Sequence, residues 1–178
     1  LAGQNLTDAN FEDSTLTQVD LTNAVIAGAD FEDTTAIGFT AEQLYSTASY
    51  QAQDLHGVNL EDNDLTGWNF SGQNLTGADI QEATLTDADL SAANLTGANL
   101  RGTTAIRANF QAADLDNVTF APTLADDDGR RDYSNLTQAN LSQARLTNVD
   151  FSSSTLAGAR TMLVPAPSRQ YSAKPPWR

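Results

Sequence analysis

The chain has 178 residues, enough for one domain with a substantial hydrophobic core. It carries 23 Asp and Glu against 9 Lys and Arg, and the resulting net charge of −14 argues against binding nucleic acid through phosphate contacts. Cysteine is absent, which excludes disulfides and Cys-based zinc or redox chemistry, and no run approaches the ~18 apolar residues of a membrane-spanning helix.

The chain begins inside a five-residue repeat. Self-similarity at a fixed period is the signature of a repeat architecture. Because Leu1 already stands at a repeat position, we expect that a leader such as a signal peptide was removed or that the sequence is part of a longer protein. The large apolar positions of this first run are Leu1, Leu6, Phe11, Leu16, Leu21, Ile26 and Phe31.

An insertion over about residues 36–52 interrupts the repeat. Thr40 and Gln43 match a capping box, in which a hydroxyl N-cap is followed by Gln at the third helical position. The sequence therefore predicts one short helix that begins here and ends at about Tyr50.

The first coil after the insertion differs from those that follow. The position that later holds Ala is occupied by larger or polar residues, so this coil needs a different packing. We interpret it as a junction at which the helix and Trp68 fill or cover an irregular coil. The exceptional residues are Gln53, Val58, Asn63, Trp68 and Gln73.

The longest run extends from Gln53 to Phe120, and its period decides the fold. On an α-helix, successive leucines five apart would step about 140° around the axis, and on a flat strand they would point to opposite faces. A small–polar–large triplet with inward ends, followed by a two-residue turn, puts every large residue on one side. Four such units close a square coil, and stacked coils bury one continuous core. The core positions we single out are Leu55, Phe70, Leu75, Leu95, Phe110 and Leu115.

The outward polar position supports a coil of twenty residues. Residues twenty apart would then stack at about the 4.8 Å strand spacing, and no Asp would lie directly on another Asp. The expected columns are Asp54–Asn74–Asn94–Asp114, Asn59–Asp79–Asn99–Thr119, Asp64–Thr84–Thr104 and Asn69–Asp89–Asn109.

The repeated phrase resembles that of a known family. Units such as Ala88-Asp89-Leu90 and Ala98-Asn99-Leu100 are similar to the A-(D/N)-L-x-x repeats of pentapeptide-repeat proteins. The resemblance implies an all-β solenoid, a right-handed quadrilateral β-helix, over residues 1–162. It also implies a possible partner, because some members of the family mimic B-DNA and bind DNA gyrase.

Three features outside the core were considered as sites. His56 is the only histidine and reads as a lone surface imidazole. Residues 62–67 begin like a calcium loop, but Gln73 stands where the bidentate Glu should be. Residues 121–133 are a surface loop by composition, and Asp126–Asp128 within it either bind calcium or form a solvated acidic loop.

Residues 163–178 form a Pro-rich tail that we expect to be either disordered or extended along a neighbouring molecule. Residues 164–168, V-P-A-P-S, resemble the V-P-E-P-S sorting motif of exosortase substrates, with Ala in place of Glu. That resemblance implies an exported protein, and we expect an extracellular or cell-surface location, with a cytoplasmic one as the alternative.

No nucleophile–base pair or phosphate loop is present in the sequence, so we expect no enzyme activity, cofactor, metal or small-molecule substrate. The first hypothesis is a structural protein that stacks head to tail through open β-helix ends and the tail, forming a filament or surface layer. The second is a DNA mimic that binds a type II topoisomerase. The interface residues of the first hypothesis are Leu1, Leu6, Pro165, Pro167, Tyr171 and Trp177.

Overall fold

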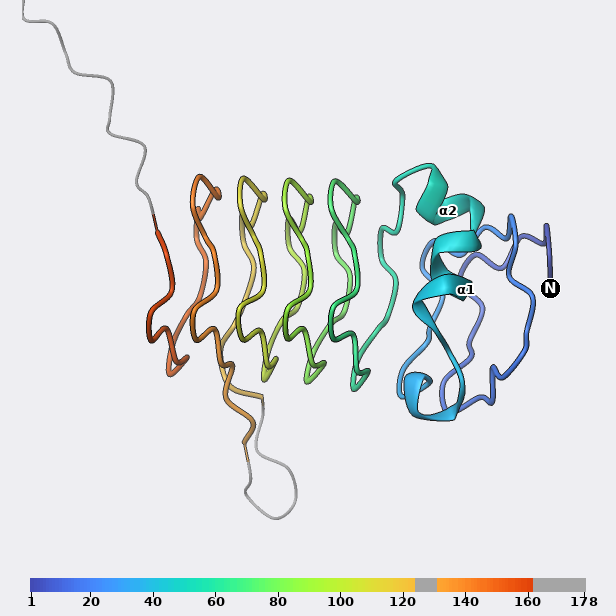
Figure 1. Ribbon diagram of the computed structural model, residues 1–178, viewed down its shortest axis with the longest axis horizontal. Helices are drawn as coiled ribbons and strands as arrows, with labels where there is room; N and C mark the ends of the chain where they lie inside the picture. The colour runs from blue at the N-terminus through green and yellow to red at the C-terminus, as the bar shows by residue number, and fades with distance from the viewer. Residues whose placement is uncertain (124–130, 162–178) are drawn as a thin grey trace, which may run out of the picture.

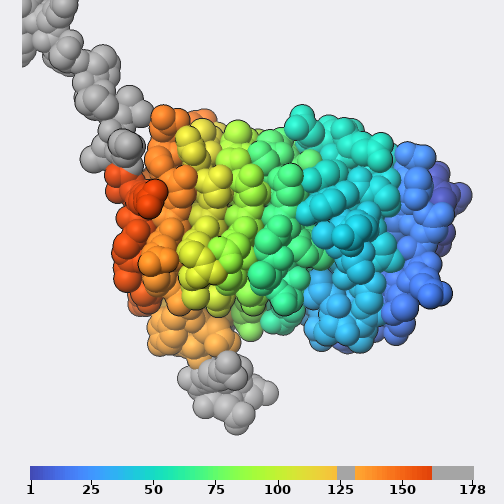
Figure 2. Space-filling model, in the orientation of Figure 1, coloured from blue at the N-terminus to red at the C-terminus, as the bar shows by residue number. Residues whose placement is uncertain are grey.

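The computed structural model describes residues 1–123 and 131–161. The chain winds into a stack of coils, with the N-terminus at one end and residue 161 at the other (Figures 1 and 2). Parallel bridges join residues twenty apart, for example Asp54 with Asn74 and Asn74 with Asn94. A coil is therefore four pentapeptides long, which confirms the predicted square winding.

The four sides of the coils carry the predicted columns, and bridges extend each column beyond the second insertion. We name the sides by their outward polar residues. Side 1 holds Asp54, Asn74, Asn94, Asp114 and Arg145; side 2 holds Asn10, Asp30, Asn59, Asp79, Asn99, Thr119 and Asp150; side 3 holds Asp64, Thr84, Thr104, Asn135 and Thr155; side 4 holds Asn69, Asp89, Asn109, Asn140 and Arg160.

One dry core runs along the stack. Each side directs a large residue and a small residue inward, as Leu95 and Ala93 do, and the two share the cross-section of the coil. Burial of each large side chain contributes roughly 1.5–3 kcal/mol. The six core positions singled out above are fully buried: Leu55, Phe70, Leu75, Leu95, Phe110 and Leu115.

The outward Asp and Asn side chains shape the corners. Asp64 Oδ1 accepts the amide proton of Thr66 at 3.0 Å, and Asn94 Oδ1 does the same for Thr96 at 3.1 Å. Such Asx turns hold the chain at the corner, where the second turn residue has a positive φ (58° at Ala112). The polar middle residue of the repeat is therefore part of the winding itself.

The first insertion contains three short helices, η1 (Thr35–Ile37), α1 (Ala41–Ser46) and α2 (Ala48–Gln51). The expected capping box is present at Thr40 and Gln43. The helix predicted to end at about Tyr50 is divided in two, because Thr47 adopts an extended conformation (φ −70°, ψ 151°). Its hydroxyl then caps α2 by accepting the amide proton of Tyr50 at 3.1 Å.

The helices stand where sides 3 and 4 of the second coil would lie, since Ile37 accepts the amide proton of Leu16 and Tyr45 accepts that of Asn69. Toward the first coil, Gln43 Nε2 donates to the carbonyls of Leu16 and Val19 at 2.7 and 2.8 Å. Toward the third coil, the Asp64 amide donates to Thr35 Oγ1 at 2.9 Å. Side chains of the insertion thus form hydrogen bonds with backbone groups of the first and third coils that a regular second coil would bond through its own backbone. We call this insertion the joint between the two coils.

The buried Asn63 links the third coil to the start of this joint through side-chain hydrogen bonds. Its Oδ1 accepts the amide protons of Thr34 and Thr35 at 2.9 and 2.8 Å, and its Nδ2 donates to the Phe31 carbonyl at 2.7 Å. An Ala, which stands at the corresponding position of the next coil (Ala83), could make none of these bonds.

The second insertion leaves the stack at one corner. Thr123 and Asp132 close its base, because the Thr123 amide donates to the Asp132 carbonyl at 3.0 Å. The ladder resumes with the bridge from Thr104 to Asn135. Within residues 1–123 and 131–161, no helix has the length and apolarity needed to cross a membrane.

Candidate functional surfaces

The joint creates a surface groove of about 760 Å³, which we call the insertion groove. It lies between the helices of the insertion and the turn that leads from side 3 to side 4. Its lining consists of Thr35, Ala36, Phe39, Thr40, Ala41, Glu42, Tyr45, Asp62, Asp64, Thr66, Gly67 and Trp68.

The floor of the groove is aromatic. Trp68 contacts Phe39 edge to face at 5.6 Å and Tyr45 at 6.5 Å between ring centroids. Phe39 and Trp68 are buried, with 2% and 8% of their surface exposed, whereas Tyr45 is half-buried. Trp68 thus packs together with residues of the insertion at the coil interpreted as a junction, and these residues leave a concave aromatic surface beside the helix.

Three carboxylates lie among the lining residues, Glu42, Asp62 and Asp64, and all three residues are exposed. The lining contains no Lys or Arg. Partial burial, followed by the charges of Asp33 and Asp132, raises the pKa of Asp62 above its ordinary value. The groove therefore combines aromatic faces with negative charge, a combination suited to cationic side chains.

A second acidic feature runs along the corner between sides 2 and 3, and we call it the acidic corner. Its seven carboxylates come from four consecutive coils. They are Glu12, Asp13, Glu32, Asp33, Glu61, Asp62 and Glu82.

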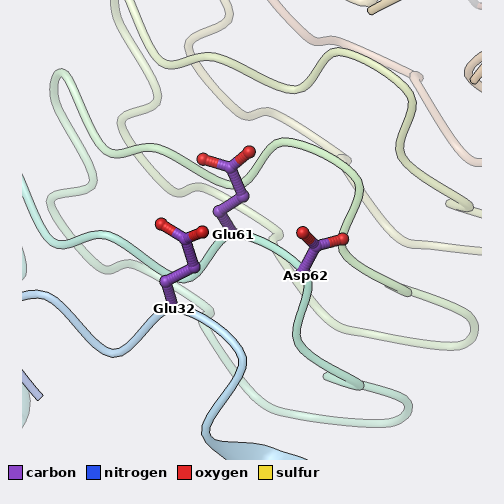
Figure 3. Close-up of side chains that lie close together, drawn as sticks. All are labelled: Glu32, Glu61 and Asp62. Carbon is purple, nitrogen blue, oxygen red and sulfur yellow. The ribbon is translucent and has the colours of Figure 1, made fainter. Parts of the chain in front are cut away.

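Glu32, Glu61 and Asp62 come closest together within the acidic corner, with one oxygen of each within 4.8 Å of the others (Figure 3). Burial first, and then the charges of Asp79, Glu32 and Asp62, raise the pKa of Glu61 to about 7. Gln81 Nε2 donates to Glu61 Oε1 at 2.7 Å, which partly offsets this repulsion. Oxygen ligands of this kind suit hard cations, although three carboxylates alone do not complete a calcium shell.

The calcium-like start at residues 62–67 does not gather its acidic side chains in one place. Asn63 turns into the core, and Asp64 accepts hydrogen bonds from its own corner. Asp62 instead joins Glu32 and Glu61. The bridge from Asp30 to Asn59 puts Glu32 beside Glu61, 29 residues later, so a regular spacing of twenty could not reveal this cluster.

The remaining candidates lie as follows. His56 is exposed, and its Nδ1 lies 2.8 Å from Asp54 Oδ1; this hydrogen bond lowers the pKa of Asp54. Leu1 is 51% exposed and Leu6 is half-buried at the N-terminal end of the stack. The other expected interface residues and the acidic loop lie outside the described residues: Pro165, Pro167, Tyr171, Trp177 and Asp126–Asp128.

Charge is distributed unevenly along the stack. Residues 1–100 contain 16 Asp and Glu and no Lys or Arg. Residues 101–178 contain all 9 Lys and Arg and 7 Asp and Glu. The N-terminal coils are therefore strongly negative, whereas exposed cations such as Arg145 and Arg160 lie on the last coils.

Comparison with solved structures finds several repeat proteins. A pentapeptide repeat protein, Rfr23, from the cyanobacterium Cyanothece 51142 is 34% identical over 56% of this chain and 60% of its own, with a TM-score of 0.48. QnrB1, a plasmid-mediated fluoroquinolone resistance protein, is 18% identical over 91% of this chain and 88% of its own, with a TM-score of 0.36.

HetL, a pentapeptide repeat protein involved in heterocyst differentiation regulation in the cyanobacterium Nostoc, is 19% identical over 89% of this chain and 85% of its own (TM-score 0.26). For Rfr23, the matched region is 60% of that protein, so the chain spans less than two thirds of the length of Rfr23. No functionally curated protein shows significant sequence similarity to the chain.

The family model for pentapeptide repeats matches in eight copies over residues 3–38, 54–91, 83–120 and 133–160. The unmatched stretches between these ranges fall on the two insertions. Proteins of this family are generally non-catalytic. Since the matches cover well over half of the sequence, the chain belongs to the pentapeptide-repeat family, whose members form right-handed quadrilateral β-helices.

Proposed function

We propose that the protein is a non-enzymatic structural protein whose copies stack head to tail through the ends of the β-helix. The aromatic column inside side 2 carries this proposal. Phe11 stacks on Phe31 at one end, with ring centroids 5.2 Å apart, and Phe151 stacks on Phe120 at the other, 5.1 Å apart. The coils between them place aliphatic residues in the same column: Leu60, Ile80 and Leu100.

The two terminal rings are half-buried, and they occupy the same angular position around the axis because their neighbours Asn10 and Asp150 belong to one bridged column. A second copy stacked in register would place Phe11 on Phe151 and continue the column as four consecutive rings. Aromatic pairs add about 0.5–1.5 kcal/mol beyond the burial of their area.

The backbone edges at the two ends are complementary. In the regular stack, Asp79 donates its amide proton to the Val58 carbonyl of the preceding coil, and Ile80 donates to Asn99 of the next coil. Among the described residues, neither the Asn10 amide nor the Phe151 amide has a backbone partner. If a second copy stacked in register, the Asn10 amide of one copy and the Phe151 amide of the other would each donate to a backbone carbonyl across the contact. The same pattern of hydrogen bonds as in the regular stack would then continue from copy to copy.

Charge favours the same arrangement. A head-to-tail contact brings the negative N-terminal coils of one copy against the last coil of another, where Arg160 is exposed; Arg145 already pairs with Asp114 and Asp116. On side 4 the in-register neighbour of Arg160 is Asp20, one coil before the position replaced by the insertion. Complementary charge of this kind selects orientation and speeds association. A contact between unlike ends that does not close into a ring produces filaments.

The test is the association state of the full chain by light scattering and negative-stain microscopy. We expect concentration-dependent filaments that weaken in Arg160→Glu and return in the double variant Asp20→Arg, Arg160→Glu. Arg107→Gln, a charge change at the corner between sides 3 and 4 and away from both ends, serves as the control and should leave assembly intact. Monodisperse monomers at high concentration would overturn the proposal.

A second candidate function is DNA mimicry toward a type II topoisomerase such as gyrase. The observation that favours it is the complete absence of cations from residues 1–100, together with the acidic corner, which presents carboxylates on four consecutive coils. Such a surface would compete for a DNA-binding groove lined by basic residues. A supercoiling assay with purified gyrase tests it, and the absence of both inhibition and protection would remove this candidate.

The setting we propose for the assembly is the outside of the cell, with the cytoplasm as the alternative. Support comes from the V-P-A-P-S segment at residues 164–168 and from the absence of cysteine. Fractionation of cells that express the protein from its native gene would decide it, and recovery only with soluble cytoplasmic markers would overturn the proposal.

A further inference from the structure

We propose that the insertion groove binds the C-terminal segment of the same chain, residues 162–178. This inference concerns the side of the stack rather than its ends, so it does not depend on head-to-tail assembly. It rests on three observations: the chemistry of the groove, the composition of the segment, and the position from which the segment departs.

The groove offers two kinds of recognition. The half-buried Tyr45 presents an aromatic face beside the largely buried Trp68, and Glu42, Asp62 and Asp64 contribute negative charge around it. Grooves lined by aromatic residues accommodate proline-rich segments in the extended polyproline conformation, because such segments lose little entropy on binding. Cations are attracted both to carboxylates and to the faces of aromatic rings.

The C-terminal segment has the complementary composition. Its 17 residues include three cations, Arg169, Lys174 and Arg178, and no Asp or Glu. It contains four of the five prolines of the chain and one of its two tryptophans. No other stretch of comparable length in the sequence combines net positive charge with this proline content.

The segment departs from the side on which the groove lies. Arg160 belongs to side 4, and four consecutive bridges connect it to Asn69, the residue after Trp68. Four ladder steps correspond to roughly 19 Å at the usual strand spacing. At about 3.1 Å per residue in a polyproline conformation, six or seven residues cover that distance. The part of the segment from about Arg169 onward, which holds all three cations, therefore reaches the groove.

The short connection favours binding within one molecule. A tether whose length matches the span gives an effective concentration in the millimolar range, which exceeds the protein concentration in ordinary experiments. Even a weak complex between the segment and the groove would then form within the chain.

Paramagnetic relaxation in the full chain carrying Arg160→Glu, the change expected to weaken filaments and so keep the protein small enough for solution NMR, tests the proposal. Because the chain has no native cysteine, Ser172→Cys provides a single site for a nitroxide spin label. The two tryptophans give two indole N–H signals, from Trp68 in the groove and Trp177 in the segment. We expect the label to remove most of the intensity of both signals. Trp177 serves as the internal positive control, because it is close to the label in every state.

Two comparisons make the result decisive. Replacing Arg169, Lys174 and Arg178 together by Gln should restore the Trp68 signal, since the charge complementarity is lost while residues 1–161 are unchanged. Mixing isotope-labelled protein that lacks the spin label with unlabelled protein that carries it should leave the Trp68 signal intact. An unaffected Trp68 signal in the spin-labelled chain, or a loss seen equally in the mixed sample, would overturn the proposal.

Discussion

Tyr45 and Asn69 are joined by a hydrogen bond that replaces a missing side of the solenoid. The Asn69 amide donates to the Tyr45 hydroxyl oxygen at 2.6 Å, while the Tyr50 hydroxyl donates to the Asn69 carbonyl at 2.8 Å. In the regular coils these two backbone groups pair with the preceding coil, as the amide of Asp89 does with the carbonyl of Trp68. Two tyrosine hydroxyls of the insertion thus replace the backbone amide and carbonyl that a regular preceding coil would supply.

This relationship predicts the effect of Tyr45→Phe. The substitution keeps the aromatic ring in the insertion groove but removes the acceptor of the Asn69 amide proton. Because Asn69 is exposed, water can partly replace the phenol, and we expect a loss of about 1 kcal/mol of unfolding free energy. Hydrogen exchange at the Asn69 amide should accelerate. Tyr133→Phe, at a residue that is 56% exposed, is the control, and equal exchange rates in both variants would contradict the assignment.

We expect a larger loss of unfolding free energy from a substitution at Asn63, because this residue is buried. Asn63→Ala leaves the amides of Thr34 and Thr35 and the Phe31 carbonyl without their partner. Each buried unsatisfied group costs roughly 1–3 kcal/mol, so we expect a loss of about 3 kcal/mol or more in urea unfolding.

Asn94→Ala is the matched control for this change. Asn94 is exposed on side 1, where its Oδ1 accepts hydrogen bonds from Thr96. Loss of the Asn94 side chain should cost only about 1 kcal/mol of unfolding free energy, because water can replace it as the acceptor for both exposed Thr96 donors. Similar losses in the two variants would mean that Asn63 is an ordinary repeat position rather than the fastening of the joint.

The difference between these two asparagines shows how far the sequence alone could predict the structure. The repeat phase placed Leu75 and Leu95 in the core and aligned Asn74 with Asn94, because every regular coil repeats the same local geometry. Asn63 was recognised only as an exception to the pattern. Its partners lie about thirty residues earlier, across an insertion whose path no local rule determines. The acidic cluster and the insertion groove were missed for the same reason.

Gly38 occupies the tightest point of the joint. Its φ is +114°, and a Cβ atom there would lie 2.7 Å from the Thr17 nitrogen and 2.8 Å from its Cα. Gly67 has a φ of +70° with nothing within 4 Å of such a Cβ. Gly67→Ala should therefore cost about 1 kcal/mol for the left-handed conformation alone. Gly38→Ala should cost several times more in chemical unfolding, because backbone must move; equal costs would contradict this packing.

The raised pKa of Glu61 makes the stability of the folded protein depend on pH. Burial and neighbouring carboxylates raise its pKa from 4.5 to about 7 in the folded protein. Between these two values the folded state therefore binds more protons than the unfolded state. The contribution of Glu61 to stability is fully present below pH 4.5 and is lost as the pH rises through 7. Burial also raises the pKa of Glu32 and Asp62, so their contributions have the same sign.

Glu61→Gln isolates this effect, because it removes the charge and keeps an acceptor for Gln81 Nε2. We expect the variant to melt at a higher temperature than the parent protein above pH 7 and at the same temperature at pH 4.5. Asp87→Asn provides a contrast of opposite sign, since its hydrogen bond with Arg107 lowers the pKa of Asp87. That variant should melt lower than the parent above pH 7, and the deficit should shrink as acid protonates Asp87 in the parent. If Glu61→Gln shifted the melting temperature equally at both pH values, the change would reflect packing, and the clustered carboxylates of the acidic corner would not be its cause.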